Sequence, residues 1–320
     1  MIRYLDTRAV DDLLTGVDVV AAVEQAQIGH AQGRTVLPAE AYLRWDVGDG
    51  WARSLTLPAA LGAPPHTAGI KVINGNIANP GRGMPRASGL ILLFDVETGQ
   101  VTTVMAAARI SAMRTAAVSV AGVRRLAPRP VESVLVVGAG PIGAAHVRLL
   151  CDTVPTVRTV WTYDLDAARS RELATTSPAV EAVPEWRAVA GRADAVIGAT
   201  TSTGPYLALA DIREGAIVVN VGLDDCAEDL LLGADHLVVD SWELVAGDTH
   251  RLLGRLIAAG RVTAPVPELG RVLAGADAVA PGPDDRVVLN PFGMAVNDMA
   301  VATAVQRLAA EREAGIFLPR

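Results

Sequence analysis

The 320-residue chain has a net charge of −7 at pH 7, and 51% of its residues are hydrophobic. This hydrophobic fraction can supply the cores of two domains of ordinary size. The acidic balance excludes a nucleic-acid-binding surface, which needs a basic excess or a basic patch, and favours a protein that acts on a small molecule.

Residues 1–128 have the pattern of a mixed helix and sheet domain. Helical apolar spacing covers residues 9–33 in two pieces, the second of which begins after Asp18. Strand-length apolar runs, separated by turn clusters, fill residues 53–104 and predict a largely antiparallel sheet. Residues 108–127 have helical character, and the two prolines that follow them predict the domain boundary.

From residue 134 onward, apolar runs of strand length alternate with helical segments. This alternation is typical of a doubly wound parallel sheet, so we predict an α/β fold with a Rossmann domain over residues 129–292. One more helical pattern covers residues 295–315, and no further strand is expected. Because this helix follows the second domain, we expect residues 293–320 to pack back on the first domain and complete it.

The segment VLVVGAGPIGAAHV places a GxGxxG motif directly after a hydrophobic strand and at the start of a helix. In such a motif Gly138 allows a tight turn, Gly140 lets the backbone approach a pyrophosphate, and Gly143 lets the helix lie close to the strand. The phosphates would then bind at the helix N-terminus, beside Pro141 and Ile142. The alternative is a glycine-rich turn that binds no ligand.

Asp164 stands 21 positions after Gly143, at the end of the next predicted strand. A carboxylate at this place accepts hydrogen bonds from the adenosine ribose and disfavours a ribose phosphate, so it predicts NAD rather than NADP. The alternative is that Asp164 or Asp166 only caps the helix that follows. Arg169 leaves NADP as the second choice.

Lys71 is the only lysine among 28 basic residues, the others being arginine. It lies in the predicted strand AGIKVI, so if Ile70 and Val72 face the core, Lys71 faces the opposite side. One interpretation is a solvent-exposed strand face. The other is a site that needs a compact ammonium group where a planar guanidinium would not fit.

Several arginines could join Lys71 in binding a carboxylate. Arg44, Arg86 and Arg114 are the candidates, with Arg53 the weakest, and Arg114 stands in an otherwise small and apolar helix. Arginines hold the carboxylate of an amino or keto acid in a fixed orientation. The alternative for each one is a surface residue.

Polar residues also follow two strands of the predicted parallel sheet, where such sheets build their sites. Asp224 and Asp225 follow one strand, and either could accept a proton from a substrate amine or from water, or could cap the next helical turn. Thr200, Thr201 and Ser202 follow another strand and could line the cofactor. The five histidines form no metal-like or triad-like arrangement.

The sequence predicts neither a metal site nor a membrane partner. The only cysteines, Cys151 and Cys226, stand far apart and show no metal-ligand spacing, which is compatible with a reducing cytoplasm. The first 14 residues are charged throughout and lack a signal-peptide core, and no apolar run has the length of a membrane span. We therefore expect a cytoplasmic protein.

The order of these motifs resembles the ornithine cyclodeaminase and mu-crystallin family almost from end to end. The resemblance implies a discontinuous α+β substrate-binding and dimerisation domain joined to a Rossmann domain, and hence a homodimer. By position, Lys71, Arg114 and Arg44 match substrate ligands of the family, and Asp298 matches an acid near the nicotinamide. The matching segments are GIK, GMPRASGLILLFDVETGQ, ISAMRTAAVS, GAGPIG, ADAVIGATTS and NPFGMAVNDMA.

One segment departs from the ornithine cyclodeaminases proper. Their catalytic aspartate lies in a segment like GGDCPGK, whereas this chain has GLDDCAED, where Asp224 is the simple match and Asp225 the alternative. This segment, with PRAS and NPFG, looks more like the branch that makes 2,3-diaminopropionate by oxidative cleavage of an amino-acid/2-oxoacid conjugate. Arg86 would suit a substrate with additional carboxylates.

The resemblance implies an enzyme that moves hydride from a substrate Cα to NAD, after which water opens the imine. Lys71, Arg44 and Arg114 would hold the substrate, and Asp224 or Asp225 would be the base. The alternatives are a cyclodeaminase that returns the hydride and releases ammonia, a reductase of ketimines or imino acids, and a non-catalytic NAD(P)H-binding protein of the mu-crystallin kind.

Overall fold

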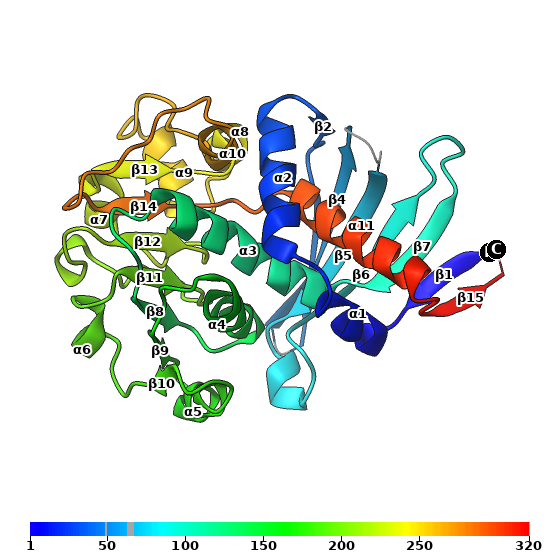
Figure 1. Cartoon of the computed structure of the whole chain (residues 1–320), viewed down its shortest axis with the longest axis horizontal. Coiled ribbons are helices and arrows are strands. Elements are labelled where there is room, and N and C mark those ends of the chain that lie inside the picture. The colour runs from blue at the N-terminus through cyan, green and yellow to red at the C-terminus, as the bar shows by residue number, and fades with distance from the viewer. Residues whose placement is uncertain (49, 63–66, 320) are drawn as a thin grey trace. The chain divides into compact units, whose positions relative to one another are not determined.

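The computed structural model describes residues 1–48, 50–62 and 67–319, and it divides into two compact units (Figure 1). Unit 1 comprises Met1–Arg114 and Met294–Arg320, and unit 2 comprises Thr115–Gly293. The division falls inside helix α3 (Ala108–Leu126) rather than at residue 128, where the prolines follow the helix. Those prolines end the helix, but they do not mark where the contacts change from one unit to the other.

Eight strands of the described residues form the sheet of unit 1, in the order β15-β1-β7-β6-β5-β4-β2, with β3 paired to β4. Every pair except β1 with β7 is antiparallel, so the predicted antiparallel character is confirmed. The strands are β1 (Ile2–Leu5), β2 (Thr35–Val36), β3 (Ala41–Val47), β4 (Gly50–Leu61), β5 (Thr67–Asn76), β6 (Ala87–Phe94), β7 (Val101–Ala106) and β15 (Ile316–Leu318).

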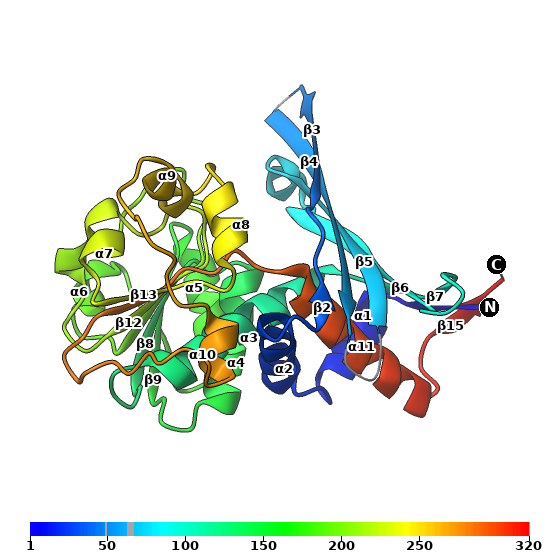
Figure 2. The ribbon, with the colours of Figure 1, turned by 90° about the horizontal axis from the view of Figure 1, so that it is seen from above.

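The helices of unit 1 are α1 (Thr7–Leu14), α2 (Val19–Ala31), the 3₁₀ turn η1 (Asn79–Arg82), the start of α3, and α11 (Ala295–Glu311). Helix α2 begins after Asp18, as expected, because the Asp18 carboxylate accepts a hydrogen bond from the Ala21 amide at 3.0 Å. Helix α11 lies across β4, β5 and β6 and beside α2 (Figure 1, Figure 2).

The expectation that no strand follows α11 is wrong. Three exposed residues at the C-terminal end, Ile316–Leu318, form β15 and pair antiparallel with β1. A run this short, on the edge of a sheet, gives no alternating pattern from which a strand could be predicted.

Unit 2 contains a seven-stranded parallel sheet in the order β10-β9-β8-β11-β12-β14-β13, so the predicted α/β fold with a doubly wound sheet is confirmed. The strand order reverses between β8 and β11, where doubly wound sheets bind their ligands. The strands are β8 (Ser133–Val137), β9 (Thr159–Tyr163), β10 (Val180–Ala182), β11 (Ala195–Gly198), β12 (Ile217–Asn220), β13 (His236–Val238) and β14 (Val287–Leu289).

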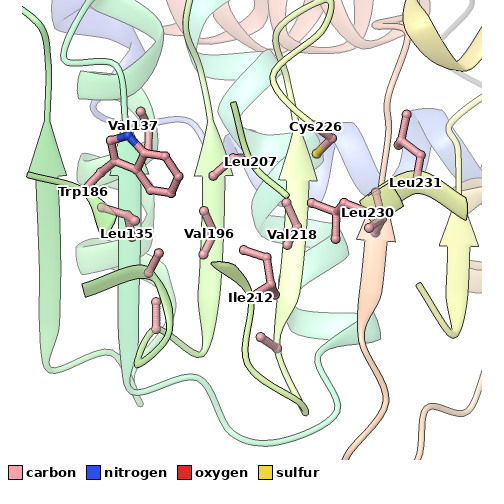
Figure 3. Packing of buried hydrophobic residues seen from close by; sticks show 14 of the residues in the cluster. Leu135, Val137, Trp186, Val196, Leu207, Ile212, Val218, Cys226, Leu230 and Leu231 are labelled. Carbon is pink, nitrogen blue, oxygen red and sulfur yellow. The ribbon is translucent and has the colours of Figure 1, made fainter. Parts of the chain in front are cut away.

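Helices cover the sheet of unit 2 and enclose a core of buried apolar side chains, in which Trp186, Leu135 and Val218 lie (Figure 3). No helix of the described residues is both long and apolar enough to span a membrane. The helices and 3₁₀ turns are α4 (Pro141–Thr153), α5 (Ala167–Ala174), α6 (Arg187–Ala190), η2 (Leu209–Asp211), α7 (Glu228–Gly233), α8 (Trp242–Gly247), α9 (Leu252–Ala258) and α10 (Leu269–Leu273).

Candidate functional site

The glycine motif forms the turn between β8 and α4, at the point where the strand order of unit 2 reverses. Gly138 has φ = +105°, a conformation that side chains disfavour, and a Cβ there would lie 2.5 Å from the Ala199 carbonyl oxygen. A Cβ on Gly143 would lie 1.8 Å from the Gly138 carbonyl oxygen. Gly138 is therefore required by its backbone conformation and by the chain that follows β11, and Gly143 by the close approach of α4 to the turn.

Gly140 is different, because a Cβ added to it would meet no atom within 4 Å. Its backbone borders open space and it precedes Pro141, the first residue of α4, whose N-terminus has no side-chain cap. The amide groups of Ile142 and Gly143 in the first helical turn can therefore donate to an anion, and the helix dipole favours negative charge there. These features fit the pyrophosphate of a dinucleotide.

Asp164 follows β9 and contacts the glycine turn directly. Its Oδ2 accepts from the Ala139 amide at 2.8 Å, and its Oδ1 accepts from the Asp166 amide at 2.9 Å. Asp166 caps α5 through the Ala168 amide, and the Arg169 Nε lies 3.4 Å from its carboxylate. Capping thus belongs to Asp166, while Asp164 ties the end of β9 to the turn.

Adjacent acids in the segment after β12 have different surroundings. Asp224 lies 2.7 Å from Arg255 and accepts from the Leu252 amide at 2.6 Å, so it holds the start of α9. Asp225 is completely buried and hydrogen-bonds the hydroxyl of Thr200, and it accepts from the Thr200 amide at 3.3 Å. Burial raises the pKa of Asp225. Of the two acids, Asp225 is therefore the one that hydrogen-bonds a residue just after β11.

The other two polar residues after β11 do not join Asp225. Thr201 and Ser202 are exposed, and the Ser202 hydroxyl donates to the Gly204 carbonyl at 2.6 Å. They lie beside Thr200, next to the point of reversal in the sheet, where they can border a bound ligand.

Lys71 lies on the face of the unit 1 sheet that α11 covers. Its side chain is buried, while Ile70 and Val72 on the opposite face are only partly buried. The predicted alternation holds, and of the two interpretations of Lys71 the solvent-exposed one is wrong, because Lys71 lies on the covered face. The Lys71 Nζ donates to Oδ2 of Asp298 at 2.7 Å and to the hydroxyl of Ser111 at 3.3 Å.

Arg114 binds the other oxygen of the same carboxylate, since its Nε lies 3.1 Å from Oδ1 of Asp298. Asp298 is completely buried in the first turn of α11, where the helix dipole favours its negative charge. Burial, followed by the charge of Arg114, lowers the pKa of Lys71 to about 8, although Asp298 acts in the opposite direction. We call Lys71, Arg114, Asp298 and Ser111 the lysine network.

Ser111 was not predicted, although it lies three residues before Arg114 and therefore on the same face of α3. Arg44 and Arg86 are not part of the lysine network. Arg44 is exposed, with its guanidinium carbon 4.7 Å from the ring centre of Trp51. Arg86 follows the connection between β5 and β6 and lines a small hollow there. No cluster of three or more potential metal ligands was found among the described residues.

Comparison with known proteins gives consistent matches. The ornithine cyclodeaminase/mu-crystallin family profile matches residues 4–313. The N-((2S)-2-amino-2-carboxyethyl)-L-glutamate dehydrogenase of Staphylococcus aureus is 29% identical over 313 residues, covering 93% of this chain and 92% of that protein. The Delta(1)-pyrroline-2-carboxylate reductase of Paracoccus denitrificans is 30% identical and covers 75% of this chain and 78% of its own. The crystal structure of CmnK is 34% identical, with a TM-score of 0.93, and covers 99% of this chain and 98% of its own.

Proposed function

The chain belongs to the ornithine cyclodeaminase/mu-crystallin family, and on that premise we propose that it oxidises a Cα–N bond with a nicotinamide dinucleotide. The substrate is a conjugate of an amino acid with a 2-oxo acid, of the kind named for the Staphylococcus aureus relative. The observation that carries this proposal is the lysine network, because two buried cations share one carboxylate and retain a net positive charge for an anionic substrate.

The secondary amine of the conjugate loses hydride from Cα and a proton from nitrogen, giving an imine. Water adds to the imine carbon, and the C–N bond then breaks. The products are a primary amine and a 2-oxo acid, with one NADH and one proton. For the glutamate conjugate these products are 2,3-diaminopropionate and 2-oxoglutarate.

Each residue of the lysine network has a separate role in this proposal. Lys71 and Arg114 bind the carboxylate of the amino-acid part of the substrate, which holds the neighbouring C–N bond in a fixed orientation. Asp298 positions both cations, since each of its oxygens accepts from one of them. With a pKa of about 8, Lys71 can also give up a proton near neutral pH.

Asp225 is the proposed base. Its raised pKa brings the carboxyl group closer to the pH at which it can both accept and release a proton. Asp224 is less suited, because it pairs with the cation of Arg255 and holds the start of α9, whereas the Thr200 groups that donate to Asp225 are uncharged. Asp225→Asn should lower kcat about 10²- to 10⁴-fold without changing cofactor affinity, whereas Asp224→Asn should mainly lower stability. Equal kcat losses in the two variants would exclude this assignment.

The glycine turn would bind the dinucleotide through Gly138, Gly140 and the start of α4, and the bound nicotinamide would accept the hydride. Asp164 supports NAD over NADP, since its carboxylate stands at the end of β9 and would repel a ribose phosphate. Thr200, Thr201 and Ser202 would border the cofactor. We also propose a homodimer, which light scattering would reveal as twice the chain mass of 33.2 kDa.

A reductase of cyclic imino acids is the second candidate, supported by the similarity to the Paracoccus denitrificans reductase. The two candidates, and a cyclodeaminase, differ in their products. The purified protein would be incubated with NAD and a panel of amino acids and conjugates, with NADH absorbance and ammonia followed together. Net NADH with release of a 2-oxo acid is the expected result.

Other outcomes of this assay would replace the proposal. Ammonia without net NADH would indicate a cyclodeaminase. NADH consumption with a cyclic imine, and no reaction with any conjugate, would indicate the reductase. Stoichiometric cofactor binding without any turnover would indicate a binding protein.

A further inference from the structure

A second group of cations lies in unit 1, on the same sheet as Lys71. In the register of the sheet, Arg44 of β3 is directly opposite Arg53 of β4, and Arg53 is directly opposite Gly75 of β5. Directly opposed residues project from the same face of a sheet. Gly75 is four residues from Lys71 along β5 and therefore on the same face, about 13 Å away at 3.3 Å per residue.

Arg86 approaches this row from the connection between β5 and β6. Its carbonyl oxygen accepts from the Asn76 amide at 3.0 Å, which fixes its backbone at the end of β5. Desolvation, followed by the charge of Arg53, lowers the pKa of Arg86. The guanidinium groups of Arg53 and Arg86 are thus close enough to repel one another.

A hollow lies between the two arginines. It is lined by Arg53, Arg86, Trp51, Ile73, Gly75 and Ile77, among others. A Cβ on Gly75 would lie 3.5 Å from the Arg86 carbonyl oxygen and 3.8 Å from Nε of Arg53, so both arginines lie close to this glycine. The space is therefore bordered by two cations and an indole ring.

This arrangement is unfavourable for the protein alone. Like charges directly opposite one another on neighbouring strands are destabilising, and Arg44 and Arg53 are such a pair. Among residues 1–48, 50–62 and 67–319, no carboxylate forms an ion pair with Arg44, Arg53 or Arg86. Lys71 and Arg114 differ in this respect, because they share the carboxylate of Asp298.

We infer that Arg53 and Arg86 form a second carboxylate site, which selects conjugates of a dicarboxylic 2-oxo acid over conjugates of a monocarboxylic one. This inference rests on the proposed function and names the substrate class. The amino-acid end of the conjugate is held at the lysine network, and the distal carboxylate of the oxo-acid part reaches the hollow. Arg53 and Arg86 are positioning residues, so their loss acts mainly on KM.

The test compares two conjugates of 2,3-diaminopropionate, one with 2-oxoglutarate and one with 2-oxobutyrate, which lacks the distal carboxylate. Arg53→Gln and Arg86→Gln should each lower kcat/KM for the dicarboxylic conjugate about 10- to 100-fold, mainly through KM. For the monocarboxylic conjugate the change should stay within about twofold. Arg8→Gln, an exposed arginine on α1, is the control and should leave both values unchanged.

A stability measurement separates this role from a structural one. Arg53→Gln removes the like-charge pair with Arg44, so its thermal midpoint should equal or exceed that of the wild type. Equal losses on both conjugates, a lowered midpoint, or no loss on either conjugate would overturn the second carboxylate site.

If the wild type oxidises no conjugate, the proposed function fails and the site is tested by binding. Calorimetric titration with 2-oxoglutarate should then show binding to the wild type and to Arg8→Gln, and none to Arg53→Gln or Arg86→Gln. Binding that is absent from the wild type, or unchanged in the variants, would remove the site as well.

Discussion

Asp298→Asn is the most direct perturbation of the lysine network, because it keeps the volume of the side chain and removes its charge. In the wild type the completely buried carboxylate accepts from Lys71 at 2.7 Å and from Arg114 at 3.1 Å. The variant leaves two buried cations without a counter-charge. Removing one partner of a buried ion pair costs about 3–5 kcal/mol of the free energy of unfolding.

Part of this cost should appear as a change in the protonation of Lys71. In the wild type, the shift of the Lys71 pKa from 10.5 to about 8 corresponds to about 3 kcal/mol. That penalty is fully present below pH 8 and disappears as the pH rises from 8 to 10.5, because the neutral amine tolerates burial. Asp298→Asn removes two of the three interactions that raise this pKa and leaves that of Glu40, so the pKa should fall by about 1–3 units. Lys71 would then be largely neutral at pH 7.

The single lysine makes this measurement simple. With lysine labelled with ¹³C at Cε only, the protein gives one lysine resonance in NMR, and its titration reports Lys71 alone. Urea unfolding gives the free energy. The matched control is Asp11→Asn, which breaks a partly exposed pair with Arg109 at 2.8 Å and should cost at most about 1 kcal/mol. A Lys71 pKa that stays at or above 8 in Asp298→Asn, or equal losses of stability in both variants, would refute the reasoning.

Three further predictions concern turnover, cofactor binding and acid stability. Lys71→Arg should abolish turnover but leave cofactor binding intact, as measured by NADH fluorescence; normal activity would exclude the role given to Lys71. Gly140→Ala should fold normally, because its Cβ meets no protein atom, but it should lose cofactor affinity. Gly143→Ala should lose stability as well, because its Cβ would lie 1.8 Å from a carbonyl oxygen. Burial lowers the pKa of His146 from 6.5 to about 4. The free energy of unfolding of the wild type should therefore fall by about 3 kcal/mol as the pH falls from 6.5 to 4, because the unfolded chain takes up the proton first. If the difference in this free energy between the wild type and His146→Asn does not change with pH, this cause is wrong.

Local sequence was sufficient to predict the glycine turn. Gly143 and Asp164 contact Gly138 and Ala139 within one strand–turn–helix–strand segment, whereas Gly138 also approaches Ala199, which follows β11. The environment of Lys71 could not be predicted in the same way. Alternation along β5 separates the two faces of the strand, but which face is covered depends on α11, and the partner Asp298 is 227 residues away.

The adjacent acids Asp224 and Asp225 show a second limit. Capping a helix and accepting a proton both require a carboxylate, so residue type alone could not assign the two roles. The structure separates them through Asn220, whose side-chain oxygen accepts from the amides of Asp225 and Cys226 at 3.2 Å each and fixes the path of the chain after β12. Asp225 then points toward Thr200, and Asp224 toward Arg255.

The difference between lysine and arginine explains why this arginine-rich chain has a lysine at position 71. Arg114 already occupies one oxygen of Asp298, and a second guanidinium would keep two positive charges against one negative charge at every accessible pH. Lys71 instead donates to one oxygen of Asp298 and to the hydroxyl of Ser111. Because its pKa is lowered to about 8, loss of its proton changes the net charge of the lysine network from one to zero near neutral pH. If Lys71 binds a substrate carboxylate as proposed, that carboxylate favours the charged form of Lys71, and its departure favours the neutral form. On that proposal the protonation state of Lys71 is coupled to occupancy of the site, which no arginine at this position could achieve.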